Sequence, residues 1–427
     1  MNISLNQRDK KFRIILITTI SICYTTFLIR NNLFNAPIQT PDSALYFEFN
    51  LLKSVRMPGI VLPYILLKNH IVITVFHLLL NCVAFTYLLI VLNVTSKELY
   101  VLLIKIFILI TLLVNSFATR WINIIMSESI TISLTVILIG TIILLFYFPN
   151  SISIFVLNNI VIIFFSSVKQ ASAMIGILIF LVILYISRRL KFKGKSIIVL
   201  ISFSLFTYLI FLSFSVDNIS GYNLIAILGY RVMTNLEWRN WFEARGLPTN
   251  FLESMQVENS GALDINAALV DPKIVQWLEN QGMQDYLKFS ITHLDYTFFG
   301  PFFPQIFGEI HGFGSSLVWN NLLLENLVWG SFFKYILIVL AILISLLFIV
   351  TRHEIYENSS NVKANLVVVI ISILWAYLVW QLAPGDFTRT QFPSGLMLAI
   401  ASGFLIVDVA SSVYKEIFLR EQVSNKV

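Results

Sequence analysis

An acidic and a basic residue bracket a short polar stretch that lies between two long apolar runs. The stretch, TPDSALYFEFNLLKSVRMPG, runs from Thr40 to Gly59, with Asp42 near its start and Arg56 near its end. A carboxylate in the position of Asp42, just after a first apolar run, can accept the proton of an attacking hydroxyl. We therefore treat Asp42 as a candidate general base and ask which elements must position it.

The same stretch has the features of an amphipathic helix along an outer membrane surface. Thr40 suits the N-cap, and Asp42 falls in the first turn, where the helix dipole favours an anion. The helix must end by Met57, because a residue before proline leaves helical geometry. Arg56 is then about 20 Å from Asp42 at about 1.5 Å per residue, so each charge needs its own partner. Two interpretations stand: a functional acid, or charges that only complement the helix dipole.

The composition predicts an all-α polytopic membrane protein. The chain has 427 residues, of which 57% are hydrophobic and 12% are charged, and its mean hydropathy is +0.83. A soluble domain is about one quarter charged, so the missing charge decides the class. About ten segments are apolar over the roughly 20 residues that a spanning helix needs. They are 13–30, 71–93, 99–118, 127–148, 152–167, 171–187, 196–213, 334–351, 364–382 and 393–411.

Basic residues predict the orientation of these segments. Lys and Arg gather before the first segment, in SRRLKFKGK at 187–195, and after the last segment. Because Lys and Arg are retained on the cytoplasmic side, we expect both termini inside and a multi-pass protein of the plasma (cytoplasmic) membrane. The formal charge of +6 has the same explanation, so the lipid bilayer is an expected partner and nucleic acid is not.

Three regions follow from this topology. Residues 1–213 form an N-terminal membrane module with an outer first loop at 31–70, where the catalytic region is expected. Residues 214–333 form one large extracytoplasmic or interfacial loop region with helix-like amphipathic stretches, the first of which ends at a C-cap glycine, Gly246. Residues 334–427 hold the C-terminal membrane helices and a short cytoplasmic tail.

Charged residues at the outer ends of other segments add to the first loop. Glu128 begins a span in MSESITISLTVILIG, and Lys169 with Gln170 interrupts an apolar run in SSVKQASAMIGILIFL. Asp386 and Arg389 precede the last span in GDFTRTQFPSGLMLAIASG. An ionisable group close to the membrane core indicates function. The structural alternatives are a surface lysine, a helix-dipole acid, a turn acid and an interface anchor.

Together these motifs resemble the polytopic glycosyltransferases of the GT-C fold, particularly the protein-mannosyltransferase and aminoarabinose-transferase type. The resemblance includes the first-loop acid followed by Ser43 and Tyr46, the RMPG sequence that contains Arg56, and the three outer motifs above. Ser43 stands where the family usually has a second acid, and RMPGIVLP stands where it usually has Arg-x-Pro-Gly-Tyr-Pro.

The resemblance implies a GT-C-like fold and an enzyme that uses a polyprenyl-phosphate-linked sugar donor. The acceptor would be an extracytoplasmic glycan, lipid or protein, and the active site would face away from the cytoplasm. Asp42 would take the proton of the acceptor, while cationic groups would stabilise the departing phosphate. The phosphate-binding candidates are Arg56, Lys169 and Arg389. The site-supporting candidates are Ser43, Tyr46, Glu128, Gln170 and Asp386.

No cofactor is assigned. The chain has no phosphate-binding glycine loop, Walker motif or dinucleotide fingerprint, so the donor is expected to be lipid-linked already. His293 with Asp295, and Glu309 with His311, lack a recognised ligand spacing, so no metal ligands are assigned and a divalent metal stays an open alternative. His77 lies within a span and is interpreted as a polar group in helix packing.

Two other functions compete with the enzyme. A polysaccharide polymerase or ligase would be expected to carry its critical basic residues in the large loop. A transporter or flippase of lipid-linked glycans would be expected to show paired halves, or broken spans with polar residues at mid-membrane. The polar residues of this chain gather at one face and the spans are mostly uninterrupted, which favours an enzyme over a transporter. The first-loop acid favours the glycosyltransferase over the polymerase or ligase.

Overall fold

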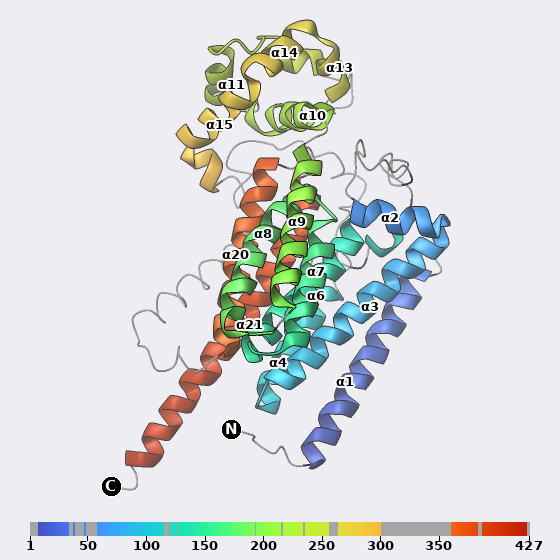
Figure 1. Ribbon diagram of the computed structural model, residues 1–427, viewed down its shortest axis with the longest axis vertical. Helices are drawn as coiled ribbons and strands as arrows, with labels where there is room; N and C mark the ends of the chain where they lie inside the picture. Colours follow the sequence, from blue (N-terminus) through green and yellow to red (C-terminus); the bar gives the residue numbers. More distant parts are fainter. Residues whose placement is uncertain are drawn as a thin grey trace.

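The chain folds into a bundle of long apolar helices with a layer of shorter helices at one end (Figure 1). The computed structural model describes residues 7–33, 37–38, 47, 58–114, 119, 121–125, 127–192, 194–214, 217–233, 235–255, 264–299, 360–382 and 387–424. Within these ranges the only extended pairing is a single parallel bridge between Ile38 and Ile124. The described part of the chain is therefore helical throughout, as predicted.

The bundle is built from helices that the hydropathy pattern predicts. Its helices and adjoining single turns are α1 (Gln7–Leu28), η1 (Ile29–Leu33), α3 (His70–Thr95), α4 (Leu99–Leu113), η3 (Trp121–Asn123), α6 (Ser127–Tyr147), α7 (Ile152–Ser166), α8 (Gln170–Ile186), η4 (Ser187–Arg189), α9 (Lys195–Phe214), α20 (Ser360–Leu382) and α21 (Phe387–Ser424). A short helix, α2 (Pro58–Leu67), lies across the upper end of the bundle in Figure 1.

Six helices in the described ranges are long and apolar enough to cross a membrane: α1, α3, α6, α8, α20 and α21. The apolar helices α4 and α7, and the apolar part of α9 at Lys195–Ile210, are shorter. At about 1.5 Å per residue a 15-residue helix is roughly 22 Å long, less than the roughly 30 Å of a hydrocarbon core. The helical class is thus confirmed, and the six candidate spans are compatible with a polytopic membrane protein. The predicted count of ten spans stays a prediction, because 334–351 lies outside the described residues.

Helix α6 is the centre of the bundle. It packs against α3, α7, α20 and α21, and 83% of its span is buried, compared with 22% for the peripheral α1. Its hydroxyl side chains are compatible with this burial, because Thr131 and Thr135 donate to the carbonyls of Ser127 and Thr131 one turn earlier, both at 2.7 Å. The first turn of this central helix carries Glu128.

Interhelical hydrogen bonds attach the shorter helices to this centre. The Asn158 amide on α7 donates to the Thr141 carbonyl of α6 at 3.1 Å. The Ser202 hydroxyl on α9 donates to the Asn159 side-chain oxygen of α7 at 3.0 Å. Polar groups of this kind hold helices together in lipid, where burial of apolar surface gives no preference between protein and lipid neighbours.

The shorter helices form a cap, which we define as the described residues between 217 and 299. Its elements are α10 (Asp217–Ile227), η5 (Leu228–Val232), α11 (Leu236–Glu243), α12 (Phe251–Met255), α13 (Ile265–Val270), α14 (Pro272–Trp277), η6 (Leu278–Gly282), α15 (Met283–Thr292) and η7 (Asp295–Phe299). These elements fall inside the predicted loop region 214–333. Gly246 has a φ of +89°, as expected for the glycine predicted to end a helix.

Local sequence signals explain where the cap helices begin. Asn235 accepts hydrogen bonds from the backbone N–H groups of Glu237 and Trp238 at the start of α11. Asp271 caps α14 in the same way, and Pro272 occupies the first helical position. The cap then closes on an aromatic core in which Trp238, Phe242, Phe289 and Tyr296 are buried.

One buried arginine joins the cap to the bundle. Arg231 of η5 is 2% exposed, donates to the Trp380 carbonyl of α20, and places its guanidinium 4.8 Å from the centre of the Trp380 ring. The Tyr286 hydroxyl donates to the Gln381 side chain at 2.7 Å. Burial lowers the pKa of Arg231 and raises the pKa values of Tyr286 and Tyr296. The cap therefore rests on the end of α20 through a buried polar contact.

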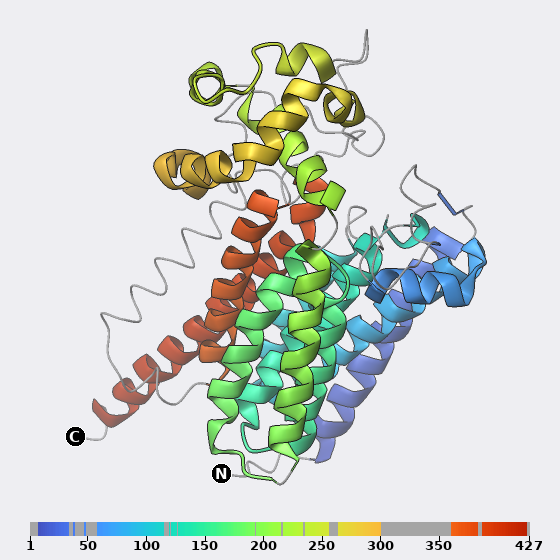
Figure 2. The same ribbon diagram turned by 45° about the horizontal axis from the view of Figure 1, so that its top comes forward.

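Figures 1 and 2 show the cap at one end of the bundle and the start of α1 and the end of α21 toward the other end. The chain segments that precede α6 and α8 turn at the capped end, near α2. That end holds two of the residues that the sequence singled out for chemistry.

Candidate functional site

Glu128 and Lys169 form an ion pair at the capped end of the bundle. Glu128 lies in the first turn of α6, and Lys169 is the residue before α8, in the turn that follows α7. The Lys169 Nζ to Glu128 Oε1 distance is 2.9 Å, and the Ser127 hydroxyl donates to the other carboxylate oxygen at 3.2 Å. The structure thus brings together two residues that the sequence placed on the same outer face.

The two partners differ in exposure. The Glu128 side chain is 2% exposed, whereas that of Lys169 is 17% exposed. A buried carboxylate is costly without a cationic partner, so the lysine makes the position of Glu128 tenable. An anion that approaches from outside the bundle meets the ammonium before the carboxylate. The pair can therefore present a fixed cation whose orientation is set by the buried acid behind it.

A buried histidine and tyrosine lie beside this pair. His77 of α3 and Tyr64 of α2 are both fully buried, and the Tyr64 hydroxyl lies 2.9 Å from His77 Nε2. His77 Nδ1 lies 3.1 Å from the Ile122 carbonyl, which can only accept a hydrogen bond. A neutral ring therefore carries its proton on Nδ1, and Tyr64 donates to Nε2. The ring is thereby tied to the η3 turn that precedes α6, the helix that carries Glu128.

The described ends of the first outer loop are anchored next to these residues. On one side, the Ile38 N–H donates to the Asn123 carbonyl at 2.8 Å, and the Ile125 N–H donates to the Ile38 carbonyl at 3.1 Å. These contacts lie just before the start of α6. The loop is therefore tied to the element that carries Glu128.

On the other side, the loop is tied to the turn that carries Lys169. The Gly59 N–H donates to the Ser167 carbonyl at 2.9 Å. A Cβ atom at Gly59 would lie 2.1 Å from the Ser167 hydroxyl oxygen, so only glycine permits this approach. Phe47 within the loop stacks on His70 with ring centres 5.4 Å apart. The glycine of the RMPG motif thus contacts the motif that contains Lys169.

The other predicted site residues lie outside the described residues, or have only their backbones described. Asp42, Ser43, Tyr46, Arg56 and Asp386 lie outside the described residues, as do Glu309 and His311. Gln170 begins α8 and Arg389 lies in the first turn of α21, and only their backbones are described. Their proposed roles stay predictions.

His77, interpreted from the sequence as a packing group, makes packing contacts and also lies at the candidate site. The sequence signal for its position was a histidine within an apolar run. Tyr64 was missed, because PGIVLPYILL, the sequence of α2, contains two prolines and was assigned to the outer loop. Within the described ranges no three His, Cys, Asp or Glu side chains come together as metal ligands.

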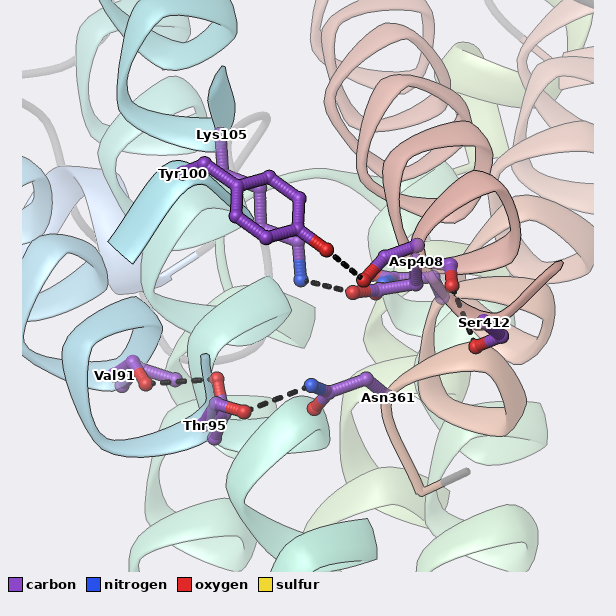
Figure 3. Close-up of polar contacts among 9 residues, drawn as sticks. Val91, Thr95, Tyr100, Lys105, Asn361, Asp408 and Ser412 are labelled. Atoms are coloured by element: carbon purple, nitrogen blue, oxygen red, sulfur yellow. Dashed lines mark hydrogen bonds and ion pairs between the residues drawn. The ribbon is translucent and has the colours of Figure 1, made fainter. Parts of the chain in front are cut away.

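A second buried ion pair, which was not predicted from the sequence, lies in the opposite half of the bundle. Lys105 of α4 and Asp408 of α21 are 2.6 Å apart, with side chains 1% and 7% exposed (Figure 3). The Asn365 amide of α20 donates to the second oxygen of Asp408 at 2.8 Å. The available signal was a single charge inside each apolar segment, which is costly in a membrane unless it is paired.

Comparison with protein-family models, with curated proteins and with solved structures finds no match for this chain. The assignment of a function therefore depends on the residues and on the geometry described above.

Proposed function

We propose that the chain is a membrane glycosyltransferase that transfers a sugar from a polyprenyl-phosphate-linked donor to an extracytoplasmic glycan, lipid or protein. The observation that carries the proposal is the ion pair between Glu128 and Lys169 at 2.9 Å. It joins two of the motifs that resemble GT-C enzymes, and the glycine of a third motif contacts the same turn through Ser167.

In the proposed reaction an acceptor hydroxyl attacks C1 of the donor sugar. The new C1–oxygen bond forms as the bond from C1 to the phosphate oxygen breaks, and polyprenyl phosphate leaves with the electron pair of that bond. Asp42 takes the proton of the hydroxyl. Lys169, helped by Arg56 and Arg389, stabilises the negative charge that develops on the phosphate.

The ion pair suits this role because it is preorganised. Glu128 holds the Lys169 ammonium in one place before the donor arrives, so little reorganisation is needed when the phosphate charge develops. The partial exposure of Lys169 supports contact with a ligand. Tyr64 and His77 fix α2 against α3, and through α2 they hold Gly59 and the end of the first loop in position.

The test is a transfer assay on the purified full chain in lipid nanodiscs. Polyprenyl-phosphate-linked mannose, glucose, galactose, N-acetylglucosamine and aminoarabinose serve as labelled donors, with a membrane extract as the source of acceptor. We expect transfer from at least one donor and a loss of about 100-fold in Lys169→Ala. Lys288→Ala removes an exposed cap lysine and is the matched control, which should keep full activity. Transfer from none of the donors, or full activity in Lys169→Ala, would contradict the proposal.

A transporter or flippase of lipid-linked glycans is the second candidate, and the pair between Lys105 and Asp408 is the observation that favours it. An ionisable pair buried within spans is a feature of coupled transport. Both side chains are enclosed by α4, α20 and α21, however, and the carboxylate also accepts from Asn365. The pair therefore fits a structural contact equally well.

The alternative of a polymerase or ligase receives less support. It would require critical basic residues in the large loop, and Arg231 is the buried arginine of that region. Arg231 contacts the Trp380 carbonyl and ring, so its described contacts fix the cap to α20.

A further inference from the structure

The cap contains a cleft of about 510 Å³ between the turn that follows α11 and the helices α14 and η6. Its lining is polar and largely exposed, with a buried tryptophan beneath. The lining residues are Gly246, Pro248, Thr249, Asn250, Lys273, Gln276, Trp277, Asn280 and Gln281. We infer that this cleft is a saccharide-binding site that holds the acceptor glycan, an inference that rests on the proposed transferase function.

The chemistry of the lining matches a polyhydroxylated ligand. Four of the lining side chains are planar amides: Asn250, Gln276, Asn280 and Gln281. Each amide can both donate and accept, which is what neighbouring sugar hydroxyls require, since each hydroxyl also does both. Thr249 adds a hydroxyl. None of the described residues that line the cleft carries a carboxylate, so the cleft does not suit a metal ion or a cationic ligand.

Trp277 supplies the second feature that points to a ligand. Its side chain belongs to a residue that is 4% exposed, and its indole N–H has no hydrogen-bond partner among the described residues. A buried donor without a partner is costly, so an acceptor oxygen from a ligand would be favourable. The edge of the ring that carries this N–H faces the cleft wall, because Trp277 Cδ1 lies 3.8 Å from the position of a Cβ on Gly246.

Gly246 adds no side chain between this edge and the cleft. Its φ of +89° suits glycine, and a Cβ there would lie 3.1 Å from Gln281 Nε2. Gln281 Nε2 donates to the Arg245 carbonyl at 2.5 Å, which fixes the plane of the amide. The absence of a side chain at Gly246 therefore leaves a fixed amide and an indole edge side by side at the wall of the cleft.

The charge of the cleft narrows the class of ligand. Lys273 is the one cation among the described lining residues, too little positive charge for a nucleic acid or a polyphosphate. It suits a neutral glycan or one with a single carboxylate or phosphate substituent. Helix α14, which lines the cleft, lies in the cap outside the apolar bundle (Figure 1). This position suits the soluble part of a glycan and not a lipid chain.

The test measures saccharide binding to the full chain in nanodiscs, with 5-fluorotryptophan in place of tryptophan. The Trp277 ¹⁹F resonance is assigned with Trp277→Phe, and methyl glycosides of glucose, galactose, mannose, N-acetylglucosamine and glucuronic acid are titrated, together with maltopentaose. We expect a saturable shift of this resonance with at least one saccharide. Gln276→Ala and Asn280→Ala should each weaken binding about fivefold, the loss of one hydrogen bond.

Glu279→Ala is the matched control, because Glu279 is exposed, adjoins Asn280 and does not line the cleft. It should bind as the wild type does. Calorimetry of the same titrations needs no tryptophan variant and serves if Trp277→Phe does not fold. The inference is overturned if no saccharide in the panel binds, or if Glu279→Ala weakens binding as much as Asn280→Ala.

Two further measurements separate this inference from the proposed function. Saccharide binding should persist in Lys169→Ala, which removes the proposed phosphate contact and leaves the cap unchanged. If the wild type binds saccharides but transfers no sugar, the proposed transferase activity is contradicted, whereas saccharide binding in the cleft is supported. If Gln276→Ala and Asn280→Ala both transfer sugar with an unchanged KM for the acceptor, acceptor binding in the cleft is contradicted, whereas the proposed transferase activity is supported.

Discussion

Lys169 contacts Glu128 across 41 positions of sequence, and the lysine is the more exposed partner of the two. The positions of the helices explain this difference in exposure. Helix α6 is the central helix of the bundle and carries Glu128 inside it, whereas Lys169 lies in the turn before α8, nearer the surface. A purely structural pair would retain most of its function with its charges exchanged, less the helix-dipole preference for an acid in the first turn of α6. A phosphate-binding pair would not, because the cation must face outward.

Exchange of the two charges therefore separates stability from activity. Glu128→Lys alone places two cations together and should lower the free energy of unfolding by about 3 kcal/mol. The double variant Glu128→Lys with Lys169→Glu should recover most of that loss and still transfer sugar about 100-fold more slowly than wild type. Thermal unfolding and the transfer assay, run on the same nanodisc samples, measure the two effects. Recovery of transfer together with stability would assign the pair a structural role only.

Gly59 offers a test of the contact between the first loop and the Lys169 turn. Gly59→Ala would place a methyl group 2.1 Å from the Ser167 hydroxyl oxygen, so the loop end and the turn must separate. We expect transfer to fall by about tenfold or more, with a loss of stability of about 1–3 kcal/mol from overpacking. Gly395→Ala in α21 is the control, since nothing lies within 4 Å of a Cβ there. Equal activities in the two variants would show that the contact does not position the site.

The pH dependence of stability tests the buried junction between the cap and α20. Burial raises the pKa of Tyr286 well above its ordinary value of 10.0. The unfolded chain loses this proton first, so the stabilising contribution is complete below about pH 10 and declines as the pH rises toward the folded-state pKa. Thermal unfolding between about pH 8 and about pH 11 should show this decline.

Tyr286→Phe should be less stable at neutral pH, because it loses the hydrogen bond to Gln381, and its stability should fall less steeply in alkali. Tyr185→Phe removes an exposed tyrosine of α8 and should keep the wild-type slope. Identical alkaline slopes for wild type and Tyr286→Phe would mean that the buried tyrosine does not limit the stability of the junction.

The sequence predicted the helices well and the contacts between them only in part. Long apolar runs specify membrane helices by composition alone, and positive charges predict which of their ends lie together. Those two signals placed Glu128 and Lys169 on one face. Their separation of 2.9 Å could not be predicted, because it depends on how α6, α7 and α8 pack. Helix α2 was missed because prolines at its first and sixth positions resemble those of a loop.

The pair between Lys105 and Asp408 shows the same limit more clearly. Each residue is a visible interruption of an apolar segment, but their contact depends on the register between α4 and α21. Lys105 lies six residues into α4 and Asp408 six residues before Tyr414, so each is about 9 Å from that end of its span. Two charges at equal depths in different helices predict an ion pair only when the helices are known to be neighbours.

This buried pair also decides between the two leading functions. Asp408→Asn would leave the Lys105 ammonium buried without its counter-charge, and we expect a loss of about 3–5 kcal/mol in the free energy of unfolding. Lys105→Met with Asp408→Asn removes both charges and should recover most of it, since a neutral pair of similar volume is often as stable as a buried ion pair. Lys363→Ala, at a partly buried lysine near the same end of α20, is the matched control.

If the chain is a transferase, the double variant should transfer sugar at the wild-type rate, because the pair lies at the end of the bundle opposite to Glu128. If it is a coupled transporter, the double variant should stop the movement of a fluorescent polyprenyl-phosphate lipid across proteoliposomes. Normal transfer in the double variant, with no lipid movement in the wild type, is the result that the proposed function requires.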